Sequence, residues 1–183
     1  VLFRSVERAH VLIEDDEIKA VETKRIRAGR VQRLDLGGLT LMPGLIDAHV
    51  HVIATTLNLG NITRESATLT GAKAGAIMRG MLMRGFTTVR DAGGADWGLA
   101  KAAELGLIEG PRLFYSGRAL SQTGGHGDFR PLTDDGTICA CCAGAQFSVI
   151  ADGVPAVQQA VREELRRGAT QIKIMASGGI ASP

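Results

Sequence analysis

The sequence has almost no excess of charge of either sign, and it lacks long apolar runs. The formal net charge of its 183 residues is only +2, and basic residues alternate with acidic ones over residues 162–167, as on a solvated helix face. This balance excludes the basic stripe of a nucleic-acid-binding surface and the cationic face of a membrane-binding helix. No apolar run is long enough to span a bilayer. We therefore expect neither a nucleic-acid nor a membrane partner.

The N-terminus shows no signal-peptide pattern, which favours a cytoplasmic location. Because the sequence begins at Val1 and not at a methionine, an exported form stays open.

Cysteine is also scarce, and the three cysteines are crowded together as Cys139, Cys141 and Cys142. An odd number at this spacing does not build a disulfide framework, and a soft-metal site would need a fourth ligand. We interpret them as loop thiols in a reducing compartment, and their role stays open.

The first 42 residues have the pattern of short strands separated by polar turns. Strand-like apolar residues occupy residues 11–13, 18–21 and 30–36, and Gly37-Gly38 is typical of a turn. This pattern predicts a small β-meander.

From Pro43 onward, strand-like and helix-like stretches alternate. We predict strands over residues 45–51, 87–90, 113–115 and 171–175, helices over 65–84, 95–105 and 153–167, and a long loop over 121–150. The first strand is largely apolar, as expected of a strand buried on both sides. The alternation predicts an α/β fold with a parallel sheet and right-handed crossovers. Four such strands fit either a small open sheet or half of an eight-stranded barrel.

His49 and His51 are the first candidates for chemistry. They point to the same side of one strand, because side chains alternate along a strand, and they stand at its C-terminal end. Two neutral imidazoles on a rigid strand can bind one divalent ion such as Zn²⁺. The alternative is a pair of partly exposed histidines at a strand end.

Three stretches of the chain resemble the amidohydrolase superfamily. Residues 43–51 (Pro-Gly-Leu-Ile-Asp-Ala-His-Val-His) resemble its first barrel strand, residues 85–94 its second and residues 171–179 its fourth. Residues 120–128 (Leu-Ser-Gln-Thr-Gly-Gly-His-Gly-Asp) and the cysteine cluster are similar to the imidazolonepropionase-like metallopeptidase group, which includes Xaa-Pro and Xaa-Arg dipeptidases and ochratoxinase-like amidases. The resemblance implies that residues 43–183 are the first four β/α units of a TIM (β/α)₈ barrel. It implies that residues 1–42 are the N-terminal part of a β-sandwich domain.

Lys173 lies in the middle of the predicted fourth strand. A bare lysine facing a barrel interior would bring an unpaired charge into a poorly solvated site. The resemblance implies that CO₂ carboxylates this lysine, and that the carbamate bridges two divalent ions, expected to be zinc, held also by His49 and His51. The alternative is a lysine paired with a carboxylate.

His126 lies in a glycine-rich loop, and the resemblance assigns it to substrate contact. The alternative is a structural loop histidine held by Asp128. Asp91 ends the predicted second strand and could support the site without contacting a metal.

The resemblance implies a metal-dependent amidohydrolase. It would cleave the amide bond of a dipeptide or N-acyl amino acid with a metal-activated hydroxide, and the complete protein is expected to be a homo-oligomer. Further histidine ligands and the general-base aspartate are expected beyond residue 183, so we expect the 183-residue chain alone to be an inactive, poorly soluble N-terminal fragment. The alternatives are a cyclic-amide hydrolase or deaminase of the same superfamily, many of which lack the lysine, and a non-catalytic fragment.

Overall fold

The computed structural model describes residues 5–133 and 147–179. The chain folds as two compact units, Val1–Met42 and Pro43–Pro183, and the boundary falls where the sequence pattern changes. The cysteines at 139, 141 and 142 lie outside the described residues. That the first unit belongs to a β-sandwich stays a prediction.

The first unit contains one antiparallel hairpin. Strands β1 (His10–Glu14) and β2 (Glu17–Glu22) pair with a register shift between Leu12 and Ile13. Asp15 and Asp16 form the connection with φ values of 48° and 67°, which is the positive-φ geometry of a tight hairpin turn.

The predicted strand over residues 30–36 is wrong, because these residues form no regular strand, although a turn does follow at Gly37-Gly38. The apolar residues there do not keep a period of two, since Val31 and Leu34 are three apart. Leu34 is exposed and therefore gains nothing from a strand conformation.

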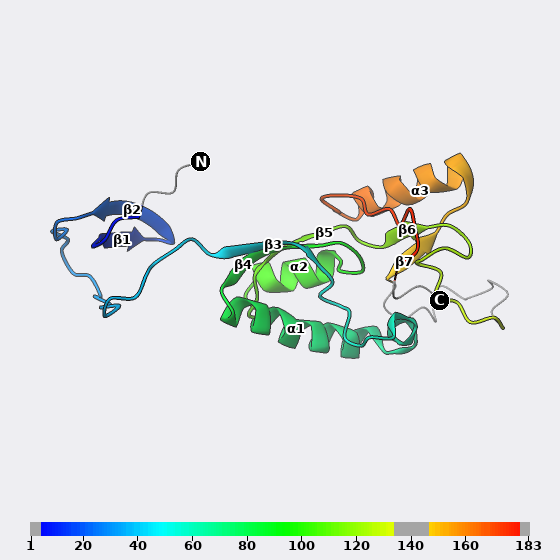
Figure 1. The fold of residues 1–183 in the computed structure, drawn as a ribbon, viewed down its shortest axis with the longest axis horizontal. Helices are drawn as coiled ribbons and strands as arrows, with labels where there is room; N and C mark the ends of the chain where they lie inside the picture. The colour runs from blue at the N-terminus through cyan, green and yellow to red at the C-terminus, as the bar shows by residue number, and fades with distance from the viewer. Residues whose placement is uncertain (1–4, 134–146, 180–183) are drawn as a thin grey trace. The chain divides into compact units, whose positions relative to one another are not determined.

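The second unit is built on a three-stranded parallel sheet, which confirms the predicted α/β class. Strands β3 (Leu45–Val50), β4 (Phe86–Asp91) and β5 (Arg112–Tyr115) lie in that order. Helices α1 (Ala67–Met83) and α2 (Trp97–Glu104) are the crossovers (Figure 1), and a short 3₁₀ helix, η1 (Leu59–Arg64), precedes α1. That this sheet is half of a barrel stays a prediction.

The core of the second unit lies on the face of the sheet that the helices cover. Val89 from β4 packs in one cluster with Ala74 and Met78 from α1, and all three are fully buried. The expectation that β3 is buried on both sides is wrong. Ile46 is 70% exposed, because β3 pairs only with β4 among the described residues.

Two very short parallel strands, β6 (Ala119–Ser121) and β7 (Ser148–Ile150), lie where the sequence predicts the edges of a long loop. Helix α3 (Gly153–Arg166) follows β7. The predicted fourth strand is reduced to one parallel bridge between Leu120 and Ile174. The Leu120 N–H donates to the Lys173 carbonyl at 2.8 Å, and the Met175 N–H donates to the Leu120 carbonyl at 2.9 Å.

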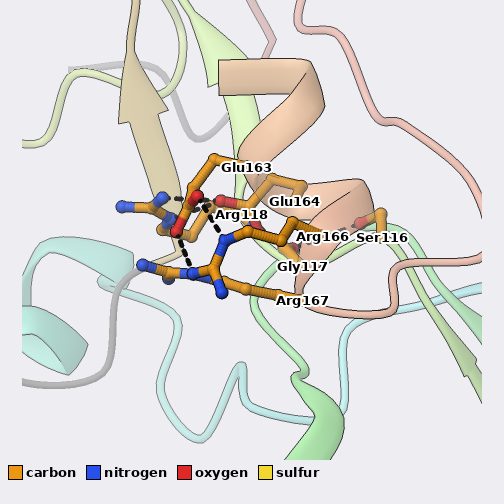
Figure 2. A network of polar contacts seen from close by, with 7 residues as sticks. All are labelled: Ser116, Gly117, Arg118, Glu163, Glu164, Arg166 and Arg167. Atoms are coloured by element: carbon orange, nitrogen blue, oxygen red, sulfur yellow. Dashed lines mark hydrogen bonds and ion pairs between the residues drawn. The ribbon is translucent and has the colours of Figure 1, made fainter. Parts of the chain in front are cut away.

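A buried ion pair between Arg118 and Glu164 holds α3 against the segment between β5 and β6. The Glu164 side chain is 2% exposed and accepts hydrogen bonds from Arg118 Nε at 2.7 Å and from the Arg118 backbone N–H at 3.1 Å. Figure 2 shows this pair beside the exposed ion pairs that Glu163 forms with Arg166 and Arg167. The contact holds the C-terminal part of α3 against the residue that precedes β6.

Among residues 5–133 and 147–179, no helix combines the length and the apolarity needed to cross a membrane.

Candidate functional site

The two histidines stand side by side at the C-terminal end of β3. His49 lies within the strand and His51 directly follows its last residue, Val50. Their ring centroids are 5.2 Å apart, with an interplanar angle of 78°. His49 is exposed and His51 half-buried. Alternation along the strand therefore brings the two rings together, as the sequence predicts.

His51 has the properties of a neutral imidazole with a free ring nitrogen. Its ring lies 5.1 Å from that of Phe147. Burial lowers the pKa of His51, the Gly93 backbone opposes this effect, and the positive charges of His49 and Lys173 lower the pKa further. The Nδ1 atom of His51 is buried and has no hydrogen-bond partner among the described residues. An orphaned buried nitrogen on a neutral ring is chemically suited to bind a metal ion.

Lys173 lies close enough to this pair for its charge to act on the pKa of His51. It is half-buried, and its backbone carbonyl is held by the Leu120 N–H. No carboxylate among residues 5–133 and 147–179 forms an ion pair with it. Within the described chain, the alternative of a paired lysine is therefore not realised.

His126 lies in the loop after β6, against the segment that follows Lys173. It is half-buried, and a Cβ added at Gly179 would lie 3.1 Å from its Cε1 atom. Asp128 forms an ion pair with Arg130 at 2.6 Å and accepts a hydrogen bond from the Gly124 N–H at 2.9 Å. Arg130 lowers the pKa of Asp128 to about 2. These contacts order the loop around His126.

Asp91 is fully buried at the end of β4. Its Oδ2 atom accepts the Val52 N–H at 2.7 Å, and its Oδ1 atom accepts the N–H groups of Gly93 at 2.9 Å and Ala95 at 3.2 Å. Burial raises its pKa to about 6 against the effect of these three bonds. Asp91 therefore joins the turn after His51 to the loop after β4.

Gln171 is a site residue that sequence reasoning missed. Its Nε2 atom donates to the Asp91 carbonyl at 2.9 Å, across 80 residues of sequence. A glutamine at the start of a predicted strand has no distinguishing sequence signal, because glutamine at such a position usually faces solvent.

The described chain has few side chains of the types that usually bind metal ions. Residues 5–133 and 147–179 contain no group of three or more His, Cys, Asp or Glu side chains arranged to hold a metal ion. The histidine pair supplies two ring nitrogens, and Lys173 is the third residue that the sequence predicts as a metal ligand; that prediction stays untested. An ammonium group cannot serve, whereas its carbamate would offer two oxygens.

The chain is similar in sequence and fold to several known hydrolases. Ochratoxinase from Aspergillus niger is 40% identical over 153 residues, which cover 78% of this chain and 32% of that protein. The crystal structure of a prolidase complexed with N-methylphosphonate-L-proline matches with a TM-score of 0.91 and 51% identity, covering 97% of this chain and 44% of that one. The crystal structure of an amidohydrolase matches with a TM-score of 0.88 and 54% identity, covering 94% and 43%.

The chain thus spans about a third of the length of the ochratoxinase and less than half of the two solved proteins. The sequence model of the amidohydrolase family matches residues 40–183, a region that contains the histidine pair, Asp91, His126 and Lys173. Because that match covers well over half of the sequence and the solved relatives share its fold, the chain belongs to the amidohydrolase family.

Proposed function

We propose that this chain supplies part of a metal-dependent amidohydrolase that cleaves the amide bond of a dipeptide or N-acyl amino acid. The observation that carries the proposal is the pair of rings at the end of β3, with the orphaned Nδ1 of His51 beside Lys173. The relatives named as an ochratoxinase and a prolidase support an amide or peptide substrate.

In this proposal, His49, His51 and the carbamate of Lys173 would hold the metal, expected to be two zinc ions. The lowered pKa of His51 keeps its imidazole neutral and able to ligate. Carboxylation would turn Lys173 from a cation that repels a metal into an anion with two donor oxygens. Bound divalent ions would polarise the amide carbonyl and lower the pKa of a water molecule to roughly 7.

We further propose that β3, β4, β5 and the segment bridged at Ile174 are the first four strands of a (β/α)₈ barrel. In such barrels the site lies at the C-terminal ends of the strands, and His49 and His51 lie at the C-terminal end of β3. The remaining ligands and the general-base aspartate would come from outside these 183 residues. That placement agrees with the small share of the relatives that the chain covers.

His126 is proposed to contact the substrate, either at the scissile carbonyl or at a carboxylate. Replacement of His126 by Asn should lower turnover by about 10²-fold or more if the ring polarises the carbonyl. Metal content should stay at the parental level, as measured by elemental analysis of the same samples. Loss of metal in this variant would instead make His126 a ligand.

The test of the function is hydrolysis of N-acyl amino acids and Xaa-Pro or Xaa-Arg dipeptides by the longer protein proposed to contain this chain, purified and with its products identified by mass spectrometry. Release of a free amino acid, abolished by a chelator and restored by zinc, is the expected result. Release of ammonia, or opening of a cyclic amide without cleavage of the linear substrates, would assign the protein to another reaction of this superfamily. Turnover of none of these substrates by a metal-loaded sample would overturn the proposal.

A further inference from the structure

The carboxylate of Asp91 accepts hydrogen bonds from three backbone N–H groups. One oxygen accepts the N–H of Val52, the residue directly after His51, and the other accepts the N–H groups of Gly93 and Ala95. An asparagine could accept through one oxygen only and would present two unwanted donors to these amides. The buried carboxylate therefore anchors the turn that leaves the histidine strand.

The backbone of Asp91 is held from the opposite direction by Gln171. The Gln171 side chain donates to the Asp91 carbonyl at 2.9 Å. The preceding residue, Thr170, is fixed by its N–H and its hydroxyl, which donate to the Tyr115 carbonyl at 2.9 and 3.1 Å. These bonds hold the backbone directly before Gln171, which lies two residues before Lys173.

We infer that Asp91 and Gln171 are positioning residues that set the separation between the histidine pair and Lys173. A continuous series of hydrogen bonds runs from Val52 through Asp91 to Gln171, and each end lies one or two residues from a proposed ligand. The inference rests on the proposed function, because the separation matters for a metal held by both strands. Neither residue would touch the metal or the substrate.

The first test measures Co²⁺ binding by visible absorption in Gln171→Leu and Asp91→Asn variants of the longer protein proposed to contain this chain. Residues that support metal ligands typically change metal affinity 10–100-fold when replaced, and we expect a loss in that range with an altered Co²⁺ spectrum. Gln159→Leu and Asp16→Asn are matched controls, because both residues are exposed and distant in sequence from the proposed ligands. Parental Co²⁺ affinity in both site variants would overturn the inference.

The second test needs no metal and uses amide hydrogen exchange of the metal-free protein. In Gln171→Leu, residues 91–95 and 171–175 should exchange faster together, whereas α3 should exchange at the parental rate. Unchanged exchange at residues 91–95 would show that Gln171 does not hold the end of β4, and would overturn the inference. If the parent binds no Co²⁺, the proposed function fails, and the exchange result alone decides whether the two segments are coupled.

Discussion

At the scale of single residues, Asp91 should make the free energy of unfolding depend on pH. Burial raises its pKa from 3.8 to about 6, so between these values the folded state keeps a proton that the unfolded state loses. The contribution of Asp91 to stability therefore falls as the pH rises from about 4 to about 6, by at most about 3 kcal/mol. The stability advantage of the parent over Asp91→Asn should shrink across this range in urea denaturation. An advantage that stays constant with pH would contradict this assignment.

Gly94, in the loop beside the site, has a backbone φ of 99°, and a Cβ there would overlap the Ile53 side chain. We expect Gly94→Ala to lower the free energy of unfolding by about 2 kcal/mol or more, since strain and overlap add. Gly71 is the matched control, because it lies in α1 and a Cβ there would meet no atom within 4 Å. Gly71→Ala should raise stability by about 0.5–1 kcal/mol. Equal effects of the two changes in thermal unfolding would refute this expectation.

His49, His51 and Lys173 could be proposed as metal ligands from the sequence, because the two histidines alternate at a strand end and the motifs around all three resemble the amidohydrolase superfamily; that they bind metal stays a prediction. The positioning residues could not be identified in the same way. Asp91 is buried only because Val52, Gly93 and Ala95 fold around it. The hydrogen-bond partner of Gln171 lies 80 residues away in the sequence. Such partners are set by tertiary packing and leave no periodic signal in the sequence.

At the scale of elements, the attachment of α3 depends on one buried carboxylate. Glu164→Gln would remove the negative charge facing Arg118, whose side chain is 19% exposed, and should cost about 3 kcal/mol. Glu163 is the matched control on the same helix, because it pairs with Arg166 and Arg167 at the surface. Glu163→Gln should cost much less than Glu164→Gln, because exposed ion pairs contribute little to stability. Denaturant melts of the two variants check this difference, and similar losses would contradict it.

The long elements follow from the sequence more reliably than the short ones. Helices α1 and α3 match the predicted ranges to within about two residues, because each contains several turns of apolar periodicity. Strands β6 and β7 have 3 residues each, too few to show a period. The segment after Thr170 has the sequence pattern of a strand but forms only one β-bridge. Strand formation depends on neighbouring strands, which the pattern of one segment does not reveal.

At the scale of the whole molecule, the described residues hold part of the proposed site and an open sheet edge at β3. The β3 strand has a single neighbour among them, and Leu45 and Ile46 are 41% and 70% exposed. Exposed apolar edges favour association between chains, so poor solubility of the 183-residue chain alone stays a prediction. The proposed second half of the barrel would cover this surface.

Whether His49 and His51 bind metal is decided by elemental analysis of the longer protein proposed to contain this chain, loaded with zinc and desalted. The parent should retain zinc at a stoichiometric level, and the His49→Ala/His51→Ala double variant should lose it. His10→Ala is the control, because His10 is exposed in β1, and it should retain the parental zinc content. Zinc bound equally by the parent and the double variant, or by neither, would show that the histidine pair is not a metal site.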